Sequence, residues 1–117
     1  MSPRRGDPVP PPVGPGEWEL VFGSNDAAKG WGDLVAHASG NMIDAWKLMR
    51  TNPSPMARTA RHHRLRGNLA YGIYRGVTLP QWQIEVTAGG RVWYLVDVEA
   101  RRVIVRHART GHPKITE

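Results

Sequence analysis

The side chains best suited to chemistry gather in two stretches of the second half of the chain. Gln83, Glu85, Arg91 and Trp93 are predicted to share one face of a β-hairpin, where they combine hydrogen bonding, charge and an aromatic ring. The stretch 58–67 is the densest cationic run of the sequence and contains two adjacent histidines. A surface that is polar, cationic and aromatic at once suits contact with nucleic acid.

Three short apolar runs are predicted to form the sheet that positions these side chains. The runs are 81–86, 91–96 and 103–108. Each is rich in β-branched or aromatic residues and is bounded by turn signals, which is typical of an antiparallel meander. A three-residue turn at 88–90 would pair Glu85 with Trp93 and keep the apolar residues of both strands on one face, whereas a one-residue slip would place Arg91 there. The third run is apolar on both faces, so its orientation stays ambiguous.

The charge of the chain is unevenly spread. Residues 1–49 hold four Lys/Arg and six Asp/Glu, a net −2, whereas residues 50–117 hold twelve Lys/Arg and four Asp/Glu, a net +8. Arginine outnumbers lysine by thirteen to three, and the arginine fork favours phosphate contacts. This asymmetry predicts a polyanionic partner for the second half, with a basic solvated face as the alternative.

The composition excludes several classes of protein. Because the chain has no cysteine, it has no disulfide framework and no thiolate metal site. No nearby carboxylate completes a metal site with His62 and His63, so we predict neither a metal nor a small-molecule cofactor. No apolar run is long enough to cross a membrane, and prolines follow Arg4 and Arg5 where a signal peptide would be apolar. We therefore expect an intracellular, cytoplasmic protein.

The length of the chain suits one domain with a modest core. Residues 1–16 contain six prolines and three glycines, and they have almost nothing to bury. We predict that this segment is a disordered or polyproline-like tail and that the domain covers residues 17–117.

The first half of this domain is predicted to contain one strand and two helices. The alternation at 17–22 predicts the strand, and Ser24 is a suitable cap for the first helix. The second helix should end at Asn52-Pro53, which makes an αα-hairpin, and 68–80 reads as a loop with at most one short edge strand. The expected fold is α+β, with the N-terminal strand and the αα-hairpin packed on an antiparallel β-meander and both helices on one face.

Three motifs, taken in this order of elements, add a resemblance to a known family. They are Arg64-Leu65-Arg66-Gly67, then Gly90-Arg91-Val92-Trp93-Tyr94-Leu95-Val96-Asp97, and then Thr110-Gly111-His112-Pro113-Lys114. Over about residues 17–117 the chain resembles the RelE/ParE superfamily of bacterial toxins from type II toxin–antitoxin systems. The order of elements and the meander spacing are moderately specific, whereas each motif alone is weak.

This resemblance implies a metal-independent endoribonuclease that cuts mRNA in the ribosomal A site and inhibits translation. Arg91 matches the arginine that contacts the scissile phosphate. His112 and Lys114 match the basic cluster that follows the last strand. Some branches use a glutamate–histidine pair for acid–base catalysis, and Glu85 with His107 or His112 would serve that role here.

The remaining candidates are cationic or aromatic side chains expected to bind RNA on one surface. They are Arg61, Arg64, Arg66, Arg106, Arg109 and Trp93. The chain also departs from part of the family pattern. Some branches place two lysines where this chain has Gln83 and Glu85, and several end in a tyrosine near where it has Thr116-Glu117.

Two other functions stay open. A ParE-like member would bind and poison DNA gyrase without a nuclease site, and the absent lysines and tyrosine favour this alternative somewhat. A non-toxic RNA-binding module of the same fold is the third possibility. For a toxin, the expected partners are mRNA on the ribosome and a cognate antitoxin whose acidic or amphipathic segment lies over the helices or the basic face.

Overall fold

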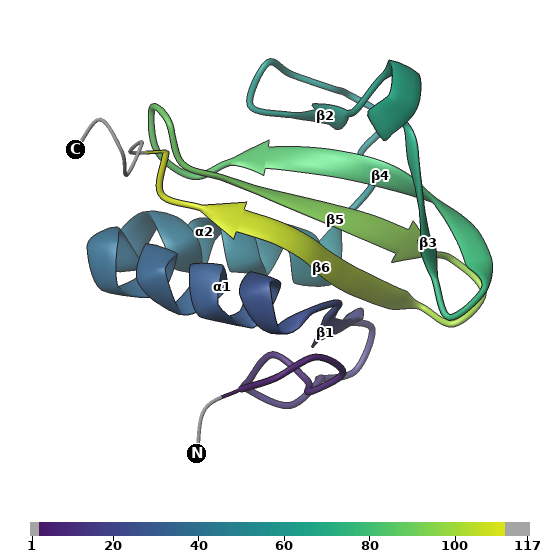
Figure 1. Ribbon diagram of the computed structural model, residues 1–117, viewed down its shortest axis with the longest axis horizontal. Helices are drawn as coiled ribbons and strands as arrows, with labels where there is room; N and C mark the ends of the chain where they lie inside the picture. The colour runs from purple at the N-terminus through teal and green to yellow at the C-terminus, as the bar shows by residue number, and fades with distance from the viewer. Residues whose placement is uncertain (1–2, 112–117) are drawn as a thin grey trace.

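The computed structural model describes residues 3–111, which form an α+β fold with two α-helices and a mixed sheet of six strands (Figure 1). In chain order the elements are β1 (Glu19–Phe22), α1 (Asn25–His37), α2 (Ser39–Thr51), β2 (His62–Arg64), the 3₁₀-helix η1 (Gly67–Leu69), β3 (Tyr71–Tyr74), β4 (Val77–Glu85), β5 (Arg91–Asp97) and β6 (Arg102–Arg109). The strand order is β1-β6-β5-β4-β2, and β3 pairs with β4 outside this path. The predicted α+β class is confirmed. The sheet is mixed because β1 runs parallel to β6, while the other pairs are antiparallel.

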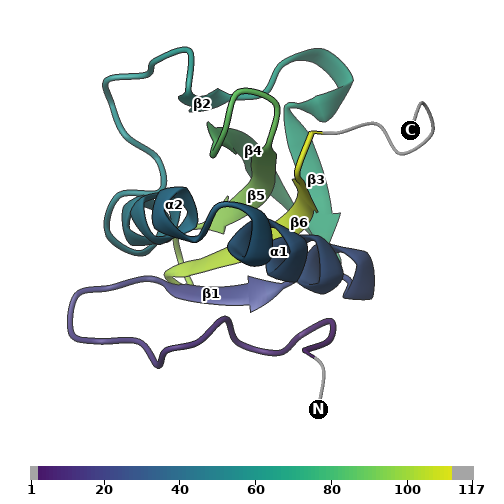
Figure 2. The same ribbon diagram turned by 90° about the vertical axis from the view of Figure 1, so that its left-hand side faces the viewer.

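Both helices cover one face of the sheet, as predicted (Figure 2). The side chain of Ser24 accepts a hydrogen bond from the backbone N–H of Ala27 at 3.0 Å, which satisfies one of the free donors at the start of α1. The apolar side chains of the two helices that are buried against the sheet are Ala27, Ala28, Trp31, Leu34, Met42, Ala45 and Met49. Within residues 3–111, no helix is both long enough and apolar enough to cross a membrane.

The loop between β4 and β5 is longer than predicted. Glu85 pairs with Arg91, whereas the predicted three-residue turn would pair it with Trp93. The hydroxyl of Thr87 accepts a hydrogen bond from the backbone N–H of Gly90 at 2.8 Å and closes a loop of five residues. The register therefore differs from the prediction by two positions. A shift of two leaves every side chain on its predicted face, so the polar face is as expected.

A β-bulge decides which side chains of β6 lie on the open face. The register between β5 and β6 shifts between Trp93 and Tyr94, and Arg106 is the extra residue on β6. A bulge adds one residue to one strand and so exchanges the faces beyond it. As a result, His107 lies opposite Trp93, and Arg109 lies on the same open face. The bulge resolves the orientation that the apolar pattern of this strand left ambiguous.

The segment predicted to be mainly a loop forms a second hairpin. β3 pairs with the first half of β4 through a two-residue turn of Arg75 (φ 51°) and Gly76 (φ 81°). Turns with two positive φ values match the twist of the flanking strands, but an arginine at the first position is not a usual turn signal. The hairpin buries a second apolar cluster, which consists of Val21, Tyr74, Leu79, Leu95 and Ile104. The loop prediction was therefore wrong for 77–80, which belong to β4, whereas β3 is the short edge strand for which the prediction allowed.

The N-terminal segment packs along β1, so the prediction of a disordered tail was wrong for residues 3–16. The backbone N–H of Gly6 donates to the carbonyl of Phe22 at 2.6 Å, and that of Val9 donates to Leu20 at 2.8 Å. The side chain of Val9 is buried in the main core. Figure 2 shows this segment running beside β1 at the edge of the sheet.

One buried arginine holds this segment in place. Arg50, at the end of α2, is 1 % exposed. Its guanidinium donates hydrogen bonds to the carbonyls of Val9 at 2.9 Å and Pro12 at 3.0 Å, and to that of Pro11. It also lies over the ring of Trp46, 5.0 Å from the centroid. A proline-rich segment has few N–H donors but keeps its carbonyl acceptors. Here an arginine that is distant in the sequence donates hydrogen bonds to these carbonyls.

Candidate functional site

The open face of the sheet carries two rows of polar side chains, each crossing β4, β5 and β6. The first row is Glu85, Arg91 and Arg109, and the second is Gln83, Trp93 and His107. β2 extends the second row, because His63 pairs with Gln83. Residues of one row are direct neighbours across strands, and the rows alternate along each strand. The sheet thus brings together three of the predicted catalytic residues, Glu85, Arg91 and His107.

The second row is held together by its own contacts. The indole N–H of Trp93 donates to Oε1 of Gln83 at 2.7 Å. The ring of Trp93 also packs on the imidazole of His107, with 4.6 Å between the ring centroids and 31° between their planes. In the first row, Glu85 forms an ion pair with Arg61, with 3.6 Å between Oε1 of Glu85 and Nε of Arg61. The packing against Trp93 limits the rotamers of His107, as a preorganised site requires, whereas the ion pair of Glu85 is made with an exposed arginine side chain.

Two features lower the pKa of His107 below its ordinary value of about 6.5. Partial burial is the larger cause, and the positive charges of Arg109 and Arg91 add to it. Each disfavours the imidazolium form. At neutral pH the imidazole is therefore neutral and able to accept a proton from a substrate hydroxyl.

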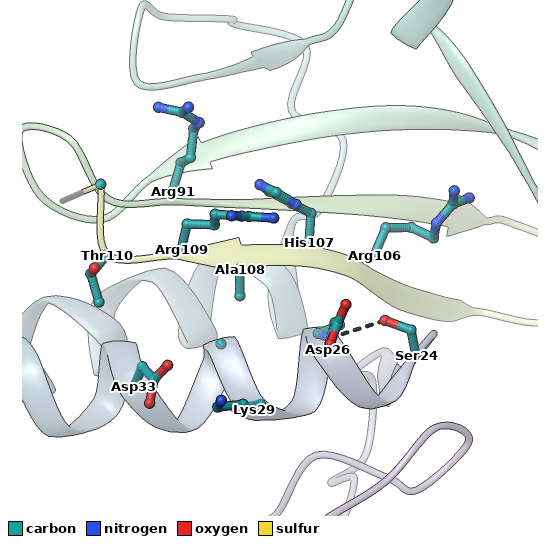
Figure 3. A pocket seen from close by; sticks show the side chains of 13 residues that line it. Ser24, Asp26, Lys29, Asp33, Arg91, Arg106, His107, Ala108, Arg109 and Thr110 are labelled. Atoms are coloured by element: carbon teal, nitrogen blue, oxygen red, sulfur yellow. Dashed lines mark hydrogen bonds between the residues drawn. The ribbon is translucent and has the colours of Figure 1, made fainter. Parts of the chain in front are cut away.

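A groove of about 620 Å³ lies beside the two rows, between β6 and α1 (Figure 3). Its strand wall carries Arg91, Arg106, His107 and Arg109. The helix can lie close to β6 because Gly30 has no side chain. A Cβ at this position would lie 1.9 Å from the carbonyl oxygen of Ala108. The arginines of the strand wall therefore lie at the rim of a groove that is large enough for a ligand, and not on a flat surface.

The helix wall of this groove carries charged residues that the sequence analysis missed. They are Asp26, Lys29 and Asp33 of α1. Their spacing of three and four residues places them on one side of the helix. All three are exposed, and this spacing was the only signal available in the sequence.

A second groove, of about 1010 Å³, lies around β2 and the following turn. Arg58, Arg64, Arg66 and Tyr71 contribute to its lining. The guanidinium of Arg64 lies 5.0 Å from the ring centroid of Tyr71 and donates to the carbonyl of Ala70 at 2.8 Å. The arginines predicted to form one RNA-binding surface are therefore divided between two grooves. Arg64 and Arg66 line this one, whereas Arg106 and Arg109 line the groove beside α1.

Two predicted catalytic residues, His112 and Lys114, lie outside the described residues. In the described part of the chain, residues 3–111, no three His, Asp or Glu side chains are grouped so that they would hold a metal ion.

The adjacent histidines of the cationic run have different environments. His63 faces the open side, whereas His62 is buried and packs edge-on against Trp82, with 5.8 Å between the ring centroids. The hydroxyl of Tyr94 donates to the carbonyl of Pro53 at 2.6 Å, so its oxygen accepts the Nε2–H of His62. This chain of hydrogen bonds ties β2 to the sheet core, and it was not apparent from the sequence.

We expect the protein to lose stability as the pH falls through about 6.5, the ordinary pKa of histidine. Burial lowers the pKa of His62, and so does the charge of His63, while the Pro53 carbonyl opposes the shift. A histidine with a lowered folded-state pKa binds its proton more readily in the unfolded chain, so stability rises with pH between the two pKa values. Urea unfolding at several pH values measures this slope, and His62→Phe should reduce it, while the part that remains is expected from His107, whose pKa is also lowered. An unchanged slope in this variant would exclude His62 as the titrating group.

Comparison with known proteins does not identify a family. No family model matches the chain, and no curated protein matches it. What defines this protein is its own fold and site, an α+β domain with a basic, partly aromatic open sheet face between two charged grooves.

Proposed function

We propose that this protein is the toxin of a type II toxin–antitoxin system of the RelE/ParE superfamily and acts as a metal-independent endoribonuclease on ribosome-bound mRNA. The observation that carries the proposal is the placement of Arg91 and Arg109 beside a neutral His107 and a carboxylate, Glu85, on one open face. The order of elements, a strand and a helical hairpin followed by a largely antiparallel sheet, supports the resemblance noted in the sequence.

The chemistry needs only these side chains and the RNA itself. His107 accepts the proton of a ribose 2′-hydroxyl, and that oxygen attacks the adjacent phosphorus. The bond between phosphorus and the 5′-oxygen then breaks, and the 5′-oxygen takes up a proton from the imidazolium of His107, which acts first as the base and then as the acid. Glu85 is a carboxylate paired with Arg61 and is not the acid of this step. Arg91 and Arg109 stabilise the additional negative charge on the phosphoryl oxygens. The products are a 2′,3′-cyclic phosphate and a 5′-hydroxyl.

The proposed partners follow from the same surface. A basic face that cuts mRNA requires neutralisation, and an antitoxin with an acidic or amphipathic segment suits this role. The substrate places the proposed activity in the cytoplasm, at the ribosome. Co-purification with the product of a neighbouring small reading frame would identify the antitoxin.

Cleavage in a reconstituted translation reaction tests the proposal. We expect the protein to cut the translated mRNA at codons in the A site, and the downstream fragments should carry 5′-hydroxyl ends. Primer extension maps the cuts, and the ability of a kinase to label the fragments without prior phosphatase treatment identifies the ends. Intact mRNA under conditions where the protein arrests growth would contradict the proposal.

One observation favours the gyrase alternative. The side-chain oxygen of Gln83 is occupied by Trp93, and Glu85 pairs with Arg61, so the positions that hold lysines in some family branches offer no cation to a phosphate. A gyrase-directed toxin would leave mRNA intact. It would inhibit DNA supercoiling by purified gyrase, which is measured on a relaxed plasmid.

A further inference from the structure

The groove between α1 and β6 has a cationic strand wall and a helix wall of mixed charge, and the two walls do not pair with each other. The strand wall carries arginines, and the helix wall carries Asp33 and Lys29. Among residues 3–111, neither Asp33 nor Lys29 forms an ion pair or a side-chain hydrogen bond. In Figure 3, Asp33 extends from α1 toward the strand wall, beneath Arg109 and Arg91.

Asp33 forms no ion pair with Lys29, which lies one turn before it on the same side of α1. Aspartate is a poor helix former in a helix interior, and Asp33 lies well inside α1. Asp26, in contrast, lies in the first turn, where the helix dipole favours a negative charge. The carboxylate of Asp33 is thus exposed, unpaired and directed into a groove whose opposite wall suits phosphate.

A single nucleotide matches this arrangement, and guanine matches it best. Its phosphate suits the arginine wall, whose forks bind phosphate oxygens. Guanine presents two adjacent donors, N1–H and N2–H, that fit the two oxygens of one carboxylate, and its O6 accepts a hydrogen bond from an ammonium group. Adenine and cytosine each present one donor beside a ring nitrogen that repels a carboxylate, and uracil presents one donor between two carbonyls. The groove volume, about 620 Å³, is within the usual range for ligand sites of roughly 300–1,000 Å³.

We propose that the groove between α1 and β6 is a guanine-reading subsite. Asp33 accepts the N1–H and N2–H of the base, Lys29 donates to O6, and Arg91 with Arg109 holds the adjoining phosphate. This inference rests on the proposed ribonuclease function, and it specifies the base that lies beside the cleaved bond.

Binding of short labelled oligonucleotides tests the subsite without cleavage. The probes are uridine octamers with one central guanosine, adenosine, cytidine or inosine and a 2′-deoxy sugar on its 5′ side, so that the bond cannot be cut. Fluorescence anisotropy with the full chain should show the guanosine probe binding at least about fivefold tighter than the others, as expected for a bidentate contact to a base. Inosine lacks the N2 amino group and should lose most of this preference.

Variants assign the preference to the helix wall. Asp33→Asn should reduce the guanosine preference to less than about twofold while the affinity for the all-uridine octamer stays level or rises. Lys29→Gln should reduce the preference partly. Asp44→Asn, which removes an exposed carboxylate from α2, is the matched control and should behave as wild type. Circular dichroism verifies that each variant is folded.

The outcomes separate this inference from the function on which it rests. If the wild type cleaves mRNA but binds all four bases equally, or if Asp33→Asn keeps the preference, the guanine subsite is wrong and the ribonuclease proposal stands. If no octamer binds, the guanine subsite is wrong, and if the translation reaction also shows no cleavage, both proposals fail. Binding that weakens with salt, at a log–log slope of about −0.7 per phosphate contacted, confirms that the backbone is held by cations.

Discussion

Replacing Arg91 by alanine should lower the rate of mRNA cleavage by a factor on the order of 10² to 10³ and abolish growth arrest. Arg91 begins β5, lies opposite both Glu85 and Arg109, and is exposed at the rim of the groove. Loss of one preorganised donor to a developing negative charge has an effect of this size in other enzymes. The fold should be unaffected, because the side chain makes one hydrogen bond, to the carbonyl of Gly89 at 3.3 Å, and is exposed.

The matched control for this variant is Arg101→Ala. Arg101 is also exposed, and it lies in the β5–β6 turn at the far end of both strands from Arg91. The variant Arg101→Ala removes the same positive charge as Arg91→Ala, but at a position away from the groove. Cleavage should therefore stay within about twofold of wild type if the rate depends on the position of the arginine and not on the net charge of the protein. Primer extension on the translated mRNA gives both rates. Equal cleavage by wild type and Arg91→Ala would show that the phosphate is held elsewhere on the protein.

Replacing Arg50 by alanine should destabilise the fold by about 3–5 kcal/mol, the usual cost of removing one partner from a buried charged network. The change removes the donors to the carbonyls of Val9, Pro11 and Pro12 and to Oε1 of Glu17, which lies 3.2 Å from Nη1. The carbonyls would then lack partners beside a cavity next to Trp46. Since small domains have only about 5–15 kcal/mol of stability in total, a loss of this size takes a large part of it.

Urea unfolding followed by circular dichroism measures this loss. Lys47→Ala is the control on the same helix, because Lys47 is exposed and its removal should change stability by less than about 0.5 kcal/mol. A chain that lacks residues 1–13 gives an independent test, since it should lose a comparable amount of stability by exposing the guanidinium without its acceptors. A loss below about 1 kcal/mol in both variants would mean that the N-terminal segment contributes little to the fold.

The contrast between these two arginines shows how far a sequence can be read. In the sequence, both residues are simply arginines. Their surroundings in the folded protein make Arg91 a candidate catalytic residue and Arg50 a core residue. Arg91 was identified because it lies on the polar face of a predicted strand, a local pattern with period two, and because it matches an arginine of the family that the chain resembles. Arg50 follows an apolar position near the end of a helix, and nothing local indicates that it binds carbonyls 38 to 41 residues earlier.

The sequence by itself determined the features that depend on local periodicity: the α+β class, the capped helix after Ser24, and the shared face of Glu85, Arg91 and Trp93. The observed register of this hairpin differs from the predicted one by two residues. The prediction of the shared face still holds, because a shift of two residues leaves each side chain on the same face. Only the tertiary structure decided the features that depend on long-range pairing. These are the bulge that turns His107 onto the open face, the approach of α1 to β6 at Gly30, and the docking of the proline-rich segment. Each of these depends on the energy of contacts between segments distant in the chain, which no local pattern of residues reports.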